Sequence, residues 1–290
     1  MSVGKYPDLE RFAQSMKMPP ENLVKAFEIE KEFHTKILAE PDRRKRRDMY
    51  QEVYNVVHPL YACYESPAPG NPKDYQIRQF RRELSGKSVL DLGCGNGNLL
   101  LSIANNLPHG RLLGIDASVP RLPKEQSQVE FHLGDIVEFE TDETFDVVFS
   151  DVVIEHIAPA DLPIHLASVR KALRPGGKFI VVTCNRLFGP TDVTRIIDFH
   201  NVNRVPAMGT HLCEMSFTEL QDLLKANGFG RFRTVASPIV RLFWPSRRPH
   251  TWLRQRLENS TLMLKLFYRF PKLSLYMGFQ TVAIISEPCP

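Results

Sequence analysis

The segment Asp-Leu-Gly-Cys-Gly-Asn-Gly, which begins at Asp91, combines one acidic side chain with three glycines at every second position. The missing side chains of Gly93, Gly95 and Gly97 let the backbone and the next helix start come close to a ligand. A fixed carboxylate at Asp91 would repel a pyrophosphate, so the pattern favours a ligand that carries positive charge. Asn98 stands where a nicotinamide-binding fingerprint has its third glycine. A glycine turn with a packing role alone is the alternative.

Acidic residues also end the next three apolar segments. Asp116 lies in Gly-Ile-Asp-Ala-Ser, Asp135 in Gly-Asp-Ile, and Asp151 in Ser-Asp-Val-Val. An acid about 20 to 25 residues after a glycine loop can accept hydrogen bonds from both hydroxyls of a ribose, and Asp116 stands at that distance. A single acid at a strand end is more often a helix cap than a ligand. Three such acids in register with one glycine loop indicate a binding site.

The elements that would position these residues follow an alternating pattern from about residue 87 onward. Short runs rich in Val, Ile and Leu, such as SVLDLG, RLLGID, FDVVFSD and KFIVVTC, are separated by helical stretches. Such runs are typical of strands buried on both faces, and the alternation predicts parallel pairing. We therefore predict an α/β fold: a doubly wound, Rossmann-like, mostly parallel seven-stranded sheet with helices on both faces and an N-terminal helical cap.

These motifs resemble those of the class I S-adenosylmethionine-dependent methyltransferases, of the bacterial small-molecule type. The resemblance covers roughly residues 87–186 by motif and extends to 290 by the order of elements. It implies S-adenosyl-L-methionine as the cofactor, with Asp91 and the glycine-loop backbone at its amino-acid end, Asp116 on the ribose, and Asp135 on the adenine amino group. The cofactor-binding positions that it implies are Asp91, Gly93, Cys94, Gly95, Gly97, Asp116, Ala117, Ser118, Asp135, Ile136, Ser150 and Asp151.

The class of acceptor is narrowed by what the fourth strand lacks. It ends in Ser-Asp-Val-Val, without the Asp/Asn-Pro-Pro-Tyr tetrapeptide of enzymes that methylate amino groups of adenine or glutamine, and no Pro-Cys nucleophile for cytosine is present there. A small-molecule acceptor is therefore favoured. Methylation at oxygen, nitrogen or carbon stays open, and we favour oxygen.

A hydroxyl acceptor must lose a proton, so a general base is expected near the methyl group. The irregular segment 184–215 is too long for a simple connection and carries three polar candidates, Asp198, His200 and His211. We predict that these residues act as the base or orient the acceptor. A histidine in a loop is nevertheless more often structural or exposed.

No metal is expected. Adjacent residues such as Glu155 and His156 occur in some quinone O-methyltransferases that bind magnesium, but the further acid of those relatives is replaced here by Val152. The five cysteines are scattered and form no Cys-x-x-Cys pair, which argues against a cysteine zinc site and a disulfide framework.

Two domains are expected in the 290 residues, which carry a formal charge of +4. The Pro- and Gly-rich stretch ESPAPGNP (65–72) predicts a boundary between an N-terminal helical cap, 1–72, and a methyltransferase domain, 73–290. Within that domain, 184–215 and 241–275 are predicted insertions. A polar N-terminus and the lack of a long apolar run predict a cytoplasmic protein.

Two basic stretches leave further interpretations open. Arg-Arg-Lys-Arg-Arg, 43–47, is most simply a solvated face. The insertion 241–275 has eight Arg or Lys residues against one glutamate, a formal charge of +7, with interleaved aromatics. It could be a lid packed on the core, a membrane-surface helix that reaches a lipid-linked acceptor, or a nucleic-acid contact.

The predicted partners are accordingly a small-molecule acceptor and peripheral membrane contact through 241–275, with nucleic acid less favoured. The rival functions are an RNA methyltransferase that uses the basic segments 43–47 and 241–272, and a non-catalytic protein that binds S-adenosylmethionine. A nicotinamide dehydrogenase is disfavoured by Asp91 and Asn98.

Overall fold

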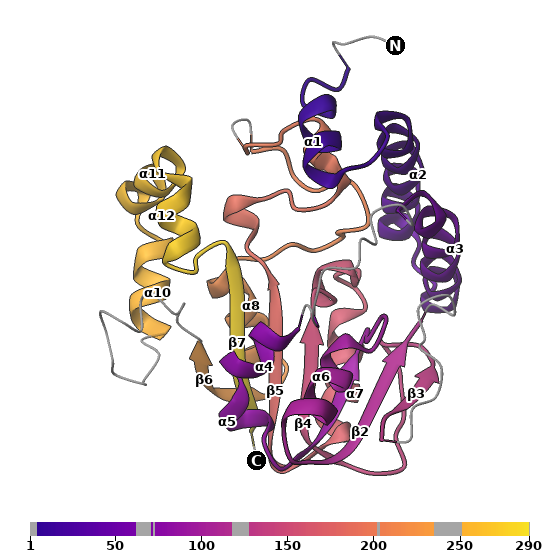
Figure 1. The fold of residues 1–290 in the computed structure, drawn as a ribbon, viewed down its shortest axis with the longest axis vertical. Coiled ribbons are helices and arrows are strands. Elements are labelled where there is room, and N and C mark those ends of the chain that lie inside the picture. Colours follow the sequence, from indigo (N-terminus) through magenta and orange to yellow (C-terminus); the bar gives the residue numbers. More distant parts are fainter. Residues whose placement is uncertain are drawn as a thin grey trace.

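The structure, a computed structural model, describes residues 5–61, 71, 73–117, 128–201, 204–234 and 251–289. Its centre is a seven-stranded sheet in the order β3-β2-β1-β4-β5-β7-β6 (Figure 1). The strands are β1 (Lys87–Leu92), β2 (His109–Asp116), β3 (Glu130–Leu133), β4 (Phe145–Asp151), β5 (Leu173–Cys184), β6 (Phe229–Thr234) and β7 (Thr281–Pro288). The predicted fold class is confirmed.

Strands β1 to β5 pair in parallel, and β7 runs antiparallel between β5 and β6. The order of strands reverses between β1 and β4, where ligands of open α/β sheets bind, at the carboxyl ends. The register aligns Leu92 of β1 with Ile115 of β2 and with Ser150 of β4. This alignment brings the ends of all three strands to one edge of the sheet, which is where the predicted acids lie.

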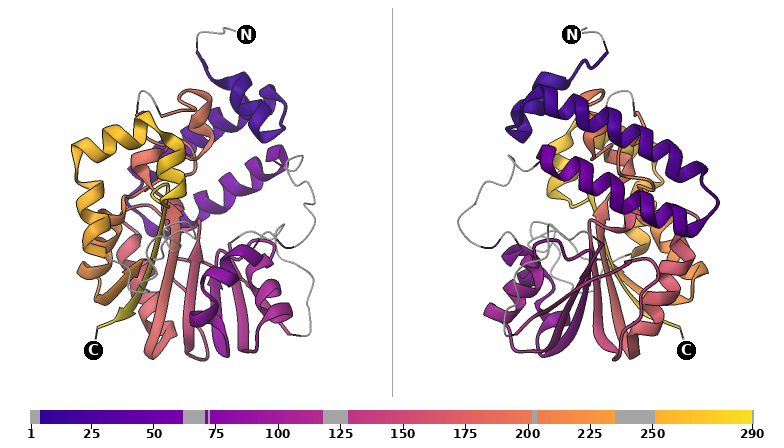
Figure 2. Two further views of the ribbon diagram at one scale, coloured as in Figure 1. Left: turned by 60° about the vertical axis from the view of Figure 1, so that its left-hand side comes forward. Right: turned by 90° about the vertical axis from the view of Figure 1, so that its right-hand side faces the viewer.

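Helices cover both faces of the sheet (Figure 2). One apolar core is shared with α7 (Leu162–Ala172) and α8 (Phe217–Ala226), and the other with α4 (Asp74–Gln79), α5 (Arg81–Leu84) and α6 (Asn98–Asn106). A capping box starts α8, since the Ser216 hydroxyl and the Glu219 carboxylate each accept a hydrogen bond from the other residue's backbone N–H. The short helices η3 (Ile154–His156), η4 (Arg186–Phe188) and η5 (Val193–Ile196) interrupt the connections.

Three N-terminal helices, α1 (Leu9–Met16), α2 (Pro20–Ala39) and α3 (Arg43–Tyr61), lie at the carboxyl-end side of the sheet. Figure 2 shows α2 and α3 side by side. Arg46 anchors α3 through a bidentate ion pair with the buried Asp161. Its Nε lies 3.0 Å from Oδ2 of Asp161, and its Nη2 lies 2.5 Å from Oδ1. Tyr50, one turn further along, also donates a hydrogen bond to Asp161, at 3.1 Å.

The interpretation of 43–47 as a solvated face is therefore wrong for two of its residues. Arg46 is 4% exposed, and Arg43, three positions earlier, forms an ion pair with Asp135. Residues three apart share one side of a helix, and in α3 that side faces the domain. Arg44, Lys45 and Arg47 are exposed, as expected.

The predicted basic insertion forms three helices where the structure describes it: α10 (Thr251–Glu258), α11 (Thr261–Arg269) and α12 (Pro271–Tyr276). Residues 241–250, most of the predicted boundary 65–72 and the predicted cofactor contact Ser118 lie outside the described residues. Within the described ranges, no helix is both long and apolar enough to cross a membrane.

Candidate active site

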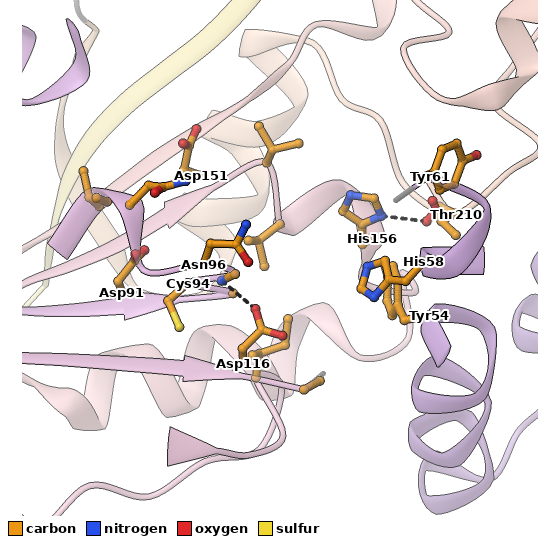
Figure 3. A pocket seen from close by; sticks show the side chains of 18 of the residues that line it. Tyr54, His58, Tyr61, Asp91, Cys94, Asn96, Asp116, Asp151, His156 and Thr210 are labelled. Atoms are coloured by element: carbon orange, nitrogen blue, oxygen red, sulfur yellow. Dashed lines mark hydrogen bonds between the residues drawn. The ribbon is translucent and has the colours of Figure 1, made fainter. Parts of the chain in front are cut away.

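A cavity of about 460 Å³ lies at the carboxyl ends of β1, β2 and β4, between the sheet and the helices α2 and α3. Its residues form two groups. The sheet end of the cavity consists of Lys73, Asp91, Gly93, Cys94, Gly95, Asn96, Asn98, Leu99, Asp116, Ala117, Ile136 and Asp151. The cap end consists of Glu30, Tyr54, Val57, His58, Tyr61, Val152, Val153, His156 and Thr210. Figure 3 shows His156 within the second group, beside His58, Tyr61 and Thr210.

The glycine loop after β1 forms the floor of the sheet end. Gly93 has a positive φ of 67°, and a Cβ there would lie 2.5 Å from the Cγ2 atom of Val153. Gly95, with φ of 52°, has open space where a Cβ would be, and its N–H donates to the Asp116 carboxylate at 2.8 Å. The loop is thus packed against β4 on one side and tied to β2, with room for a ligand above Gly95.

Three carboxylates and one cation set the electrostatics of the sheet end. Asp91 is 3% exposed, and burial raises its pKa well above the ordinary value, with the charge of Asp151 adding and that of Lys73 opposing. Lys73 forms an ion pair with Asp151. Among the described residues that line the cavity, Lys73 is the single lysine or arginine. Sequence analysis missed it, because a lysine before α4 has no local pattern that points to a distant strand end.

Most of the predicted cofactor-binding residues are brought together by the fold. Asp91, Gly93, Cys94, Gly95, Asp116, Ala117, Ile136 and Asp151 all line the cavity. Cys94 is buried, and that burial raises the pKa of its thiol. The sulfur is close-packed, since a Cβ on Gly114 of β2 would lie 2.7 Å from it. Cys94 therefore contributes shape and its backbone rather than a reactive thiolate.

The other predicted cofactor contacts lie outside the lining of the cavity. Gly97 precedes α6 with φ of 68°, and Ser150 is fully buried in β4. The Asp135 carboxylate accepts a hydrogen bond from the Val137 N–H at 2.9 Å and is paired with Arg43. An adenine amino group at Asp135 would therefore share that carboxylate with a residue of the cap.

Backbone atoms of Thr210 organise the cap end. The Thr210 carbonyl lies 3.1 Å from Nδ1 of His156, and the Thr210 N–H donates to the Glu30 carboxylate at 2.9 Å (Figure 3). Tyr61 donates its hydroxyl proton to the other oxygen of Glu30, at 2.6 Å. Glu30 is 1% exposed, and burial raises its pKa to about 7.

The three predicted catalytic residues are placed differently. His211 is buried behind His156, with the two rings 4.6 Å apart and perpendicular, and its Nδ1 lies 2.7 Å from the Glu214 carboxylate. Burial lowers the pKa of His211, but hydrogen bonds with Cys184 and Glu214 outweigh it and hold the pKa well above its usual range. Asp198 is buried and accepts a hydrogen bond from the Val205 N–H at 3.4 Å, whereas His200 is exposed. None of the three lines the described cavity.

Two overlapping groups of side chains around His211 are of types that could coordinate a metal ion. One consists of Glu155, His156 and His211, and the other of Cys184, His211 and Glu214, with the ligand atoms of each group within 4.8 Å of one another. Hydrogen bonds already join His211 to Glu214 and His156 to Thr210. The expectation that no metal is held stays a prediction.

The strand order, the antiparallel β7 and a cavity at the ends of β1 and β4 define the class I methyltransferase fold. Residues 83–228, half of the chain, match the methyltransferase-domain family, and the chain belongs to that family. The resemblance noted in the motifs is confirmed.

Individual proteins agree with this assignment. A probable S-adenosylmethionine-dependent methyltransferase of Mycolicibacterium smegmatis is 32% identical over 148 residues, 48% of this chain and 55% of that protein. A ubiquinone biosynthesis O-methyltransferase of Rhodopseudomonas palustris is 28% identical over 181 residues, 58% of this chain and 70% of that protein. A chain in the complex of the Haloferax volcanii Trm112 methyltransferase activator with a methyltransferase shares the fold, with a TM-score of 0.51 and 17% identity over 75% of this chain and 90% of that chain. The chain spans about half the length of the Mycolicibacterium smegmatis protein.

The methyl donor of this domain is S-adenosyl-L-methionine, as expected. The sheet end has features that fit it. Its amino-acid end is a zwitterion, and the lining offers both a buried carboxylate, Asp91, and a cation, Lys73. The open space above Gly95, next to Asp116, suits the nucleoside.

Proposed function

We propose that the protein methylates a hydroxyl oxygen of a small-molecule acceptor, which binds at the cap end of the cavity with His156 as its general base. His156 carries this proposal, because it lines the same cavity as the glycine loop and lies beside Thr210 at the cap end (Figure 3). When bound, S-adenosylmethionine supplies an electrophilic methyl group on a sulfonium. Everything else required is positioning, exclusion of water and removal of one proton.

The hydrogen bond to Thr210 determines which nitrogen of His156 can act as a base. A carbonyl oxygen can only accept, so Nδ1 must carry the proton, and in the neutral ring the lone pair is on Nε2. The acceptor hydroxyl would pass its proton to Nε2 as its oxygen bonds to the methyl carbon and the carbon–sulfur bond breaks. His211, packed against His156, is then a positioning residue.

The remainder of the cap end favours an acceptor with a hydrogen-bond donor. While Glu30 is ionised, Tyr61 gives its hydroxyl proton to that carboxylate, so its oxygen can only accept a further hydrogen bond. The aromatic rings of Tyr54, His58 and Tyr61 line the same end. Together these groups suit a small, ring-containing acceptor that carries hydroxyls.

We assign the cofactor contacts as follows. Asp91 binds the ammonium group, Lys73 the carboxylate and Asp116 the ribose, while Gly93, Cys94, Gly95, Ala117, Ile136 and Asp151 complete the walls of the sheet end. The roles of Gly97, Ser118, Asp135 and Ser150 in cofactor binding, and those of Asp198 and His200 in catalysis, stay predictions.

Methylation at oxygen has independent support from the Rhodopseudomonas palustris relative, which is named for O-methylation in ubiquinone biosynthesis. A lipid-linked acceptor is the narrower form of the proposal. It requires that the protein work at a membrane surface, for which the exposed apolar and basic side chains of α10 to α12 are the supporting feature.

Methyl-labelled S-adenosylmethionine, incubated with the protein and host lysate, tests the proposal. The products are separated into lipid, small-molecule, RNA and protein fractions, with the His156→Gln variant as the matched control. We expect label in the small-molecule or lipid fraction that is lost in His156→Gln. Resistance of that label to mild alkali distinguishes a methyl ether from a methyl ester. Label that appears in RNA would overturn the choice of acceptor, and equal labelling by the variant would remove the role of His156.

A further inference from the structure

Helices α10, α11 and α12 form a surface on which apolar side chains are exposed to an unusual degree. Ten large apolar side chains are exposed in the described part of the chain, and five of them lie here: Trp252, Leu262, Leu266, Phe270 and Leu275. Leu262 is 77% exposed, more than any of the other nine. Apolar groups gathered in this way mark an interaction site more often than a plain solvent-facing surface.

The same surface is positively charged. Residues 251–277 contain five Arg or Lys side chains and one acid, Glu258. Glu258 is buried and pairs with the buried Arg254 at 3.7 Å, so these two cancel inside the fold. The four remaining cations are all exposed: Arg256, Lys265, Arg269 and Lys272. Within these residues, no acid is exposed to offset them.

On α11 the two kinds of side chain share one face. Leu262 and Leu266 are four residues apart, as are Lys265 and Arg269, and such spacing places each pair on the same side of a helix. The opposite side packs inward through Phe267, which is fully buried with its ring 4.8 Å from that of Phe279. The exposed leucines are therefore not needed to hold α11 in place.

These helices are fixed to the domain rather than loosely appended. Arg254 donates a hydrogen bond to the Thr281 carbonyl of β7 at 2.7 Å, and Glu258 accepts one from Asn185, just after β5, at 2.7 Å. The guanidinium of Arg204 lies 4.4 Å from the centre of the Tyr268 ring. Figure 1 shows α11 and α12 at the carboxyl-end side of the sheet, the side where the cavity lies.

We propose that this surface, defined by the five apolar side chains Trp252, Leu262, Leu266, Phe270 and Leu275 and the four exposed cations, binds the face of an anionic lipid membrane. Leucine and aromatic side chains beside Arg and Lys suit a helix that lies in the plane of the headgroups. The cations attract anionic headgroups, and each contributes about a fivefold gain in affinity near such a surface. A nucleic acid would attract the four cations equally well, but Leu262 and Leu266 would remain exposed to water. The inference goes beyond methyl transfer, and its test needs no acceptor.

Flotation of the full-length protein with lipid vesicles tests the proposal directly. Vesicles of pure phosphatidylcholine are compared with vesicles that contain about 30% phosphatidylglycerol, at low and high salt. We expect binding to the anionic vesicles that weakens as salt screens the charges. Lys265→Gln combined with Arg269→Gln should weaken that binding by about 25-fold, because two cations are lost. Leu262→Glu should also weaken it, by tenfold or more.

Matched variants elsewhere on the molecule distinguish binding by this surface from effects of net charge or of non-specific hydrophobic adsorption. Arg44→Gln with Arg47→Gln removes two exposed cations from α3, and Leu38→Glu alters a leucine that is 46% exposed on α2. Both should keep wild-type vesicle binding within about twofold. Calorimetric affinity for S-adenosylmethionine, unchanged in every variant, shows that the domain remains folded.

Three results would overturn the proposal. One is a wild-type protein that floats with neither kind of vesicle. Another is an equal loss of binding in the α3 and α11 variants. The third is evidence that the exposed face binds another partner and not vesicles. That partner would be a second copy of the chain, seen as a dimer in light scattering, or a 20-nucleotide RNA. In either case Leu262→Glu or the double Gln variant would abolish the interaction. Failure of vesicle binding would leave methyl transfer untouched, so the two proposals can fail separately.

Discussion

The two ends of the cavity are built in different ways. The sheet end is formed largely by residues at the ends of three neighbouring strands, and its glycine loop is held by short-range contacts such as the Gly95 bond to Asp116. The cap end is assembled from α2, α3, η3 and residue Thr210, which lie far apart in the chain. The sheet end therefore depends mainly on local sequence signals, and the cap end depends on tertiary contacts.

The strongest test of this division is at His156, the proposed general base at the cap end. His156→Gln should lower kcat by about 100-fold or more, because a positioned general base contributes at least that factor. Affinity for S-adenosylmethionine, measured by calorimetry, should stay within about threefold. His132→Gln, an exposed histidine on β3, is the control. Equal kcat in the His156 variant would show that the acceptor needs no base there.

The cap end can be tested separately through Glu30, whose pKa is raised by burial from 4.5 to about 7. Between these values the folded protein holds a proton that the unfolded chain releases, so this group's contribution to stability is lost as pH rises through the window. From pH 5 to pH 8 the loss amounts to about 2–3 kcal/mol. Urea unfolding of wild type and Glu30→Gln at both pH values should show this difference.

Glu32→Gln, an exposed glutamate on the same helix, controls for the loss of one charge. It should follow the wild-type pH dependence. If Glu30→Gln also follows it, the carboxyl is not the buried, ligand-facing group that the cap end requires.

The sequence predicts the two ends of the cavity to different extents, because contacts between residues close in the chain leave a sequence pattern and contacts between distant residues do not. Gly-x-Gly-x-Gly, three acids at strand ends and the alternation of strands with helices are local signals, and they predict the fold. Of the twelve predicted cofactor positions, eight line the cavity. Asp135 shows the limit. Its carboxylate is engaged by Arg43, 92 residues away, and a run of basic residues gives no sign of such a partner.

The predicted catalytic residues show the same limit more strongly. The sequence indicates Asp198, His200 and His211 only as polar residues in a long irregular segment, whereas the cavity is lined by His156, from η3, and by Thr210. Glu30, Tyr54, His58 and Tyr61 come from helices whose sequence shows only amphipathic spacing. Their convergence depends on how α3 docks through Arg46 and Asp161, and that contact is tertiary.

At the sheet end, Asp91→Asn should have opposite effects on ligand binding and on stability. Affinity for S-adenosylmethionine should weaken by about 1–3 kcal/mol, because the ligand's ammonium group loses its charged partner. The ligand-free protein should be no less stable at pH 8, since burial disfavours the Asp91 charge and raises its pKa. Calorimetry and urea unfolding measure the two effects. Unchanged affinity would remove the main support for the assigned orientation of the cofactor.

The smallest effect is expected at Lys73, the cation assigned to the cofactor's carboxylate. Lys73→Ala should weaken S-adenosylmethionine binding by about 1 kcal/mol, the usual scale for a partly exposed ionic contact. Arg78→Ala, which removes an exposed cation of α4, should leave it unchanged. 5′-Methylthioadenosine lacks the amino-acid end, so its affinity should not depend on Lys73 or Asp91. If Lys73→Ala weakens both ligands equally, the lysine acts through Asp151 and the shape of the sheet end, rather than by contact with the carboxylate.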